Sequence, residues 1–221
     1  MNTPEPLPEL RLQAANFTVY HYLPWRDNDH EFIDLDAPYQ RGSVWTDDQR
    51  RNLIKSLLMG LPIGTLVISA LPYRKGGASY RIIDGKQRIE AVRAFWGDRF
   101  SIPGWWFAPE DLQDPSWRSE DVLFSQLSQR GQRSIEHAPL GCIEFKADLE
   151  YTPNPEYDPT LRVGYPEYRD NPHKTNRYNT RNRSDEEILR AEAELYLLVN
   201  FGGVEQTETD RARAREIAGG A

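Results

Sequence analysis

The sequence has little of what marks secreted, metal-binding or membrane-spanning proteins. Only one of its 221 residues, Cys142, is a cysteine, which excludes an internal disulfide framework and fits a reducing compartment. No His or second Cys stands at metal-ligand spacing around it, so Cys142 is predicted to be a small buried residue. No apolar run has the length of a membrane span or a signal-peptide core. We therefore expect a cytoplasmic protein.

An excess of basic residues is also missing. The formal charge is −7 and the pI is about 5.2, which argues against a surface that coats nucleic acid broadly but leaves room for a local basic patch. The hydrophobic content of 38% is enough for one core in a chain of 221 residues. One domain is therefore favoured over two.

Composition divides the chain into three parts. The Pro-rich start predicts a disordered tail over residues 1–14, and residues 15–221 form a single domain with a helical C-terminal part at 184–221. A long loop rich in Pro, Tyr and basic residues is predicted at 150–183. Basic residues with interleaved Tyr suit a nucleic-acid backbone or a phosphorylated ligand, and a solvated linker has the same composition. The basic residues concerned are Arg162, Arg169, Lys174, Arg177, Arg181 and Arg183.

Strand patterns and helix patterns alternate along the chain. Thr46 and Gln49 make a capping box before a helix that carries an apolar stripe, and Ser184 and Glu187 make a second one. Residues 64–71 and 80–83 read as an antiparallel hairpin. Residues 122–132 read as a further helix and 140–146 as a further strand.

The stretch Tyr80–Trp96 contains the best candidate for a site. A strand pattern ends at Asp84-Gly85, and a helical pattern begins at once with Lys86, Gln87 and Arg88. Gly85 allows a tight turn, and the helix N-terminus attracts anions, which is a phosphate-site geometry. The alternative is an ordinary strand-turn-helix in which Asp84 caps the helix and the cations are solvated. Cations in a first turn oppose the helix dipole, which favours a bound anion there.

Several motifs in order resemble the N-terminal domain of GmrSD-type restriction endonucleases, a ParB/sulfiredoxin-like family with a D-G-Q-Q-R signature. The segment Asp84-Gly85-Lys86-Gln87-Arg88 corresponds to that signature, with Lys86 where the family usually has Gln. No HNH-type nuclease domain is expected in this chain. The other matching segments are Pro38–Arg41 with Trp45, Gly60–Ile63 and Tyr196–Gly203.

The resemblance implies an α+β fold, with a small mixed sheet packed with helices, that binds a nucleoside triphosphate at the helix after the signature strand. We expect Mg²⁺ as cofactor. Our hypothesis for the mechanism gives catalytic roles to Asp84, Gln87 and Arg88. Arg88 and Arg41 would neutralise the phosphates, Gln87 would bind a phosphate oxygen or the attacking water, and Asp84 would bind Mg²⁺ or that water. The residues expected to bind the nucleotide and its phosphates are Gln40, Arg41, Gly85, Lys86, Arg88 and Asn200.

Three functions stay open at this point. The first is nucleoside triphosphate hydrolysis in restriction or phage defence, with DNA, a separate nuclease or another effector protein as partner. The second is a non-catalytic module that senses nucleotide or binds DNA. The third is a ParB-like nuclease, for which no His or dense carboxylate cluster gives support.

Overall fold

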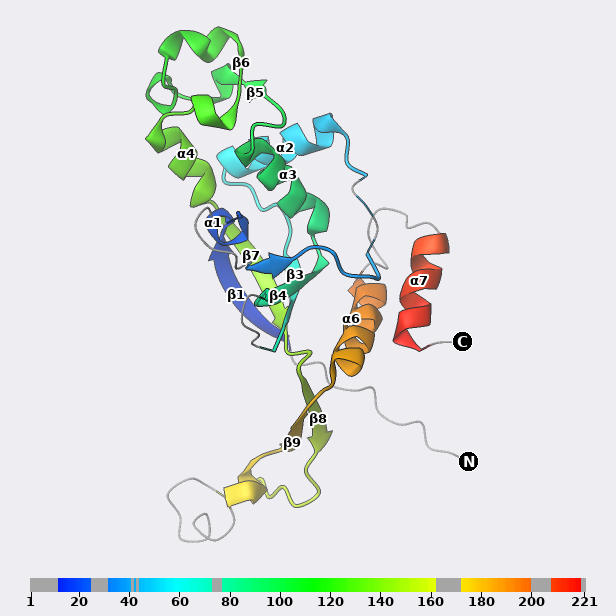
Figure 1. The fold of residues 1–221 in the computed structure, drawn as a ribbon. Coiled ribbons are helices and arrows are strands. Elements are labelled where there is room, and N and C mark those ends of the chain that lie inside the picture. The colour runs from blue at the N-terminus through cyan, green and yellow to red at the C-terminus, as the bar shows by residue number, and fades with distance from the viewer. Residues whose placement is uncertain are drawn as a thin grey trace.

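The computed structural model describes residues 12–24, 32–40, 42, 44–72, 77–161, 172–199 and 208–219 (Figure 1). The predicted α+β class is confirmed, because helices surround a mixed five-stranded sheet with the order β1-β7-β3-β4-β2. Two small two-stranded sheets lie outside it. The strands of the central sheet are β1 (Leu12–Thr18), β2 (Ile33–Asp34), β3 (Leu66–Ala70), β4 (Tyr80–Asp84) and β7 (Pro139–Phe145).

The strand pairing mixes both directions. The predicted hairpin is present, since β3 and β4 pair antiparallel with Ile68 opposite Ile82. The predicted strand at 140–146 is β7, which runs parallel to β3 and antiparallel to β1. The short strand β2 pairs parallel with β4. Three consecutive chain segments, β2, β3 and β4, therefore end up at one side of the sheet.

Side chains from both faces of this sheet are buried, in two clusters. Successive residues of a strand point to opposite faces, so Ile68 and Ile82 enter one cluster while Val67 and Ile83 enter the other. The first cluster lies against helices α2 (Asp47–Leu58) and α3 (Lys86–Trp96). The second lies against α6 (Asp185–Val199) and α7 (Glu208–Ala218). Helices thus cover both faces (Figure 1).

The two predicted capping boxes are confirmed. At α2 the Gln49 backbone N–H donates to Thr46 Oγ1 over 3.3 Å, and the Thr46 N–H donates to Gln49 Oε1 over 2.8 Å. At α6 the same two bonds join Ser184 and Glu187, at 3.3 and 2.8 Å. No helix among the described residues is long and apolar enough to cross a membrane.

The predicted helix at 122–132 is wrong. Val122, Phe124 and Leu127 are buried from short strand and 3₁₀ segments, and helix α4 (Gln129–Glu136) begins only after Ser128, whose Oγ accepts from the Gly131 N–H at 3.3 Å. Ser128, which lies inside the range predicted as a helix, is therefore the N-cap at which α4 begins. The remaining elements before α4 are α1 (Val19–Tyr22), β5 (Ile102–Pro103), β6 (Asp121–Val122), η1 (Gly104–Trp106), η2 (Pro109–Asp111), η3 (Pro115–Ser119) and η4 (Phe124–Gln126).

The stretch 150–183, predicted as a loop, contains an antiparallel ribbon. It is formed by β8 (Leu149–Pro153) and β9 (Tyr178–Asn182), with η5 (Pro172–Thr175) near its end, and it projects from the body (Figure 1). Among the described residues, neither buried cluster includes one from this ribbon. Residues 162–171 and 1–11 lie outside the described residues, and β1 begins at Leu12, inside the predicted tail.

Candidate functional site

The N-terminus of α3 is built on Gly85. This residue is the N-cap, with φ of +101°, and a Cβ at this position would lie 2.2 Å from Leu66 Cδ2. Both the backbone conformation and the close approach of β3 therefore require glycine. Asp84 does not cap the helix, as one interpretation of the sequence expected. Its Oδ2 instead accepts a hydrogen bond of 2.7 Å from Arg88 Nη2.

Arg88 ties the helix to the loop before β3. Its Nη1 donates to the carbonyl oxygens of Ile63 at 3.3 Å and Thr65 at 3.1 Å. Gly64, with φ of +86°, lies between these two residues, and a Cβ there would approach Arg88 Nη1 to 2.7 Å. The guanidinium is thus packed between two glycine positions, and its side chain is 15% exposed. Its charge is held in place by Asp84 on one side and by backbone dipoles on the other.

Gln87 fastens a second loop to the same helix end. Its Oε1 accepts from the backbone N–H groups of Val44 at 2.9 Å and Trp45 at 3.2 Å, and its Nε2 donates to the Gly42 carbonyl at 3.3 Å. Gln40, in the same loop, is buried, and its Nε2 donates to the carbonyls of Ile82 and Ile83 in β4. The two predicted glutamines therefore bind backbone and place this loop over the strand-helix joint.

Lys86, the residue that departs from the family signature, is paired with carboxylates. Its Nζ lies 3.3 Å from Asp36 Oδ1 and 3.9 Å from Glu90 Oε1, and its side chain is 14% exposed. The charge is therefore balanced locally rather than presented to solvent. Asp36 follows β2 and Glu90 lies one turn further along α3, so Lys86 joins a third segment to the helix N-terminus.

A buried charge network, which the sequence analysis missed, joins helix α6 to strand β4, the strand that leads into the site. Glu192 of α6 is fully buried, and its Oε2 lies 2.9 Å from Arg81 Nη1 of β4 and 3.4 Å from the Tyr39 hydroxyl. Arg81 Nε also donates to Asp34 Oδ2 at 2.9 Å. Burial would lower the pKa of Arg81, but the charges of Glu192 and Asp34 raise it above its ordinary value. Burial and Glu192 together raise the pKa of Tyr39.

One signal in the sequence could have revealed this network. Ile188, Glu192 and Leu195 recur at helical spacing, so the carboxylate falls within the apolar stripe that α6 buries. A carboxylate in such a stripe requires a cation from another element, because an unpaired buried charge is costly. Arg81 in β4 is that cation, and the network joins α6 to the strand that ends at the site.

The structure does not bring all of the predicted residues together. Gln40, Asp84, Gly85, Lys86, Gln87 and Arg88 meet at the α3 N-terminus, whereas Arg41, Asn200, Arg162 and Arg169 lie outside the described residues. The described basic residues of the 150–183 stretch lie in the ribbon segment, away from α3 (Figure 1). Arg181 is paired there with Glu150 and with Glu187. The Arg177 guanidinium lies 5.5 Å from the Tyr178 ring centroid, Arg183 donates to the Ala147 carbonyl, and Lys174 lies in η5.

The side chains at the site could bind Mg²⁺ only if phosphate oxygens of a ligand supplied some of the metal's ligands. Among the described residues there is no group of three or more His, Cys, Asp and Glu side chains that could hold a metal. Asp84 supplies one carboxylate, and its Oδ1 has no hydrogen bond to any described residue. Mg²⁺ in nucleotide sites is commonly held by one or two carboxylates together with substrate phosphates and water. Asp84 fits that arrangement as the protein ligand.

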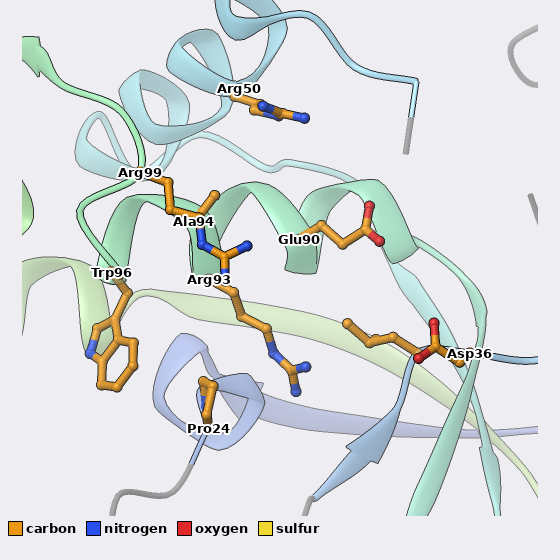
Figure 2. Close-up of a pocket in the computed structure, with 10 residues that line it drawn as sticks. Pro24, Asp36, Arg50, Glu90, Arg93, Ala94, Trp96 and Arg99 are labelled. Carbon is orange, nitrogen blue, oxygen red and sulfur yellow. The ribbon is translucent and has the colours of Figure 1, made fainter. Parts of the chain in front are cut away.

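A separate cleft lies beside α3. Its volume is about 560 Å³, and none of the described signature residues Asp84–Arg88 lines it. Arg50 of α2, Arg93 of α3 and Arg99 face it, together with Trp96, Glu90 and Asp36 (Figure 2). The Arg93 Nε donates to the Tyr22 carbonyl at 2.7 Å, which holds this side chain along the cleft wall.

Comparison with known proteins identifies the family. The model of the GmrSD restriction endonuclease N-terminal domain matches residues 26–215. The chain belongs to this family. Among the described elements, the GmrSD N-terminal domain match takes in everything from β2 to α6, while β1 and α1 precede it. Membership places the chain in a restriction or phage-defence setting. No curated protein and no solved structure gave a significant match.

Proposed function

We propose that this GmrSD-type domain binds a nucleoside triphosphate at the N-terminus of α3 and hydrolyses it with Mg²⁺, acting with DNA or a partner nuclease or effector. The observation that carries the proposal is the convergence of three segments on one helix end. Gln87 binds the Gly42–Trp45 loop, Arg88 binds the Ile63–Thr65 loop, and Asp84 ends β4.

The chemistry of this helix end suits a phosphate. The first turn of an α-helix has amide N–H groups that no carbonyl of the same helix accepts, and the helix dipole adds positive potential there. The first bonds within α3 are donated by Arg88 and Ile89, both to the Gly85 carbonyl. The N–H groups before them in the first turn therefore have no acceptor within the helix and can bind an anion.

Arg88 is proposed to neutralise the phosphates, with Arg41 as a second cation. An incoming phosphate competes with Asp84 for the guanidinium, because both are anions and charge-assisted bonds to arginine are strong. Asp84 is then available to orient the attacking water or to bind Mg²⁺. The metal would add positive charge at the transferred phosphoryl group. Gln87 is proposed to bind a phosphate oxygen or the same water.

The test compares substitutions at Arg88 and Asp84 in the full chain. Arg88→Ala should weaken binding of ATP, GTP, CTP or UTP, measured by calorimetry, by about 1.5 to 3 kcal/mol, the range for a hydrogen bond to a charged group. Asp84→Asn should keep metal-free affinity and lose Mg²⁺-dependent phosphate release. Lys86→Gln is the control, since the family's usual residue at this position is uncharged, and it should retain turnover.

Arg88→Ala also removes the bonds to Ile63 and Thr65, so activities are compared per folded molecule. The folded fraction comes from thermal unfolding followed by circular dichroism. If Arg88→Ala and Asp84→Asn both melt early but keep wild-type turnover per folded molecule, the helix end is a structural joint and the proposal is wrong.

A second candidate, nucleotide sensing without turnover, is favoured by one observation. Gln87 and Arg88 each hold a loop through backbone atoms, so a ligand that takes over these side chains releases both loops. Nucleotide would then speed hydrogen exchange at 44–45 and 63–65 without phosphate release. The nuclease alternative predicts Mg²⁺-dependent nicking of plasmid DNA, which the same preparations can be assayed for.

A further inference from the structure

The cleft beside α3 is polarised. Arg93 and Arg99 lie at its end near the C-terminus of α3, whereas Glu90 and Asp36 lie toward the N-terminal end (Figure 2). Arg50 lines the cleft from α2, where its Nη1 pairs with Asp47 Oδ1 at 3.1 Å. Arg99 is exposed, and its guanidinium forms no hydrogen bond or ion pair with any residue that the structure describes. An anion at this end would therefore find an arginine whose donors are not used by the described part of the fold.

The opposite end of the cleft requires a different chemical group. Glu90 and Asp36 both lie near Lys86, which partly offsets their charge but leaves carboxylate oxygens as acceptors. The Glu90 Oε2 is buried and has no hydrogen-bond partner among the described residues. A simple polyanion would be repelled by these oxygens. A ligand with hydrogen-bond donors at one end and negative charge at the other matches both ends.

We propose that this cleft binds a nucleotide, with its phosphates at Arg93, Arg99 and Arg50 and its ribose hydroxyl or base amino groups at Glu90 and Asp36. The volume of about 560 Å³ is within the range of small-molecule sites. It suits one nucleotide better than a strand of nucleic acid, which needs an extended basic groove. The cleft is a second site, distinct from the α3 N-terminus, and the inference does not depend on the function proposed there.

Lys86 connects the two sites. It belongs to the first turn of α3, and its carboxylate partners Asp36 and Glu90 both line the cleft. A ligand that donates hydrogen bonds to these carboxylates weakens their hold on the lysine. Occupation of the cleft thereby changes the charge presented at the N-terminus of α3, which makes the cleft suited to an effector of that site.

The test uses ADP, GDP, CDP and UDP as probes with the full-length chain, without metal. Trp96 lines the arginine end, so binding should quench tryptophan fluorescence, and Trp96→Phe should remove that component. Arg99→Gln should weaken binding of at least one of these diphosphates tenfold or more. Arg118→Gln, an exposed arginine in η3 that does not line the cleft, is the matched control and should bind as the wild type does.

A further pair of measurements tests the polarity. Glu90→Gln should weaken the same nucleoside diphosphate while leaving inorganic pyrophosphate unchanged or bound more tightly, since pyrophosphate has no donor for the carboxylate. Arg88→Ala should leave this component unaltered. If Arg99→Gln weakens binding and Arg88→Ala does not, the cleft site holds even where the function proposed at the α3 N-terminus fails.

Two results would overturn the inference. One is that all four diphosphates bind Arg99→Gln and wild type equally, or bind neither at millimolar concentration. The other is that a twelve-nucleotide single-stranded DNA binds in an Arg99-dependent way while the diphosphates do not, which would make the arginines part of a nucleic-acid surface.

Discussion

Gly85 shows most directly how a single position controls the candidate site. A side chain there meets a φ of +101° and the Leu66 Cδ2 atom at 2.2 Å. Gly85→Ala should therefore lower the free energy of unfolding by about 2 to 4 kcal/mol, the sum of left-handed strain and overpacking. Gly141→Ala, whose new methyl has no atom within 4 Å, should change it by less than about 0.5 kcal/mol in the same urea titration. Equal losses in both variants would contradict this account.

The buried pair Arg81–Glu192 gives a second prediction at the residue scale. Arg81→Met leaves the fully buried Glu192 without its cation, and should cost about 3 to 5 kcal/mol of stability in urea unfolding. The double variant Arg81→Met with Glu192→Leu should recover most of that loss, because an apolar pair needs no desolvation of charge. A double variant as unstable as Arg81→Met alone would show that the pair is not the cause.

These residues also show what the sequence alone can predict about the site. The sequence predicted that Asp84, Gly85, Gln87 and Arg88 lie where a strand meets a helix. This prediction was possible because the spacing of apolar residues changes there from that of a strand to that of a helix, which is a local signal. The partners of Gln87, Val44 and Trp45, are distant in the chain, so the loop that it holds depends on the tertiary fold. The bonds from Arg88 to the Ile63–Thr65 loop escaped prediction for the same reason.

At the scale of elements, the start of α6 should respond to acid. Glu187 bonds to the Arg181 guanidinium and the Ser184 N–H, which lowers its pKa from 4.5 to about 2. A carboxylate with a depressed pKa stabilises the fold above its unfolded pKa, and this contribution is lost as the pH falls through about 2. Glu187→Gln should therefore lower the melting temperature at pH 6, and its difference from wild type should shrink between pH 4.5 and 2.

The matched control for this prediction is Glu186→Gln in the same first turn. Its carboxylate is 3.8 Å from Arg190 and well exposed, so the melting temperature should differ little from wild type at any pH. A Glu187→Gln variant with the same pH profile as wild type would contradict the proposed role of the Arg181 contact.

Elements were predictable where local signals were strong. Both capping boxes and the β3–β4 hairpin follow from neighbouring residues. The error at 122–132 arose because Leu123 and Leu127 have the spacing of a helical stripe but lie on either side of the short 3₁₀ helix η4. The ribbon at 149–182 escaped notice because its pairing joins Leu149 to Asn182 across a stretch rich in Pro and polar residues.

At the scale of the whole molecule, the β8–β9 ribbon should be separable from the body. Leu149 and Asn182 lie opposite each other, so an Asn-Gly turn can replace residues 150–181. Since no described residue of the ribbon belongs to either buried cluster, the melting temperature should change by less than roughly 5 °C. Affinity for duplex DNA should fall, as Lys174 and Arg177 are removed. Unchanged DNA affinity would contradict a nucleic-acid role for this segment.

The position of β7 determines when the sheet can be completed on the ribosome. β7 is the last of the five strands to be synthesised, yet it lies between β1 and β3 and pairs with both. Leu12 is opposite Phe145, so at usual translation rates β1 waits on the order of ten seconds for its neighbour. The β3–β4 hairpin can form in that interval from nearby residues. Among the described strands, β1 is thus made first but paired late, and the emerging chain exposes its edge until β7 has been synthesised.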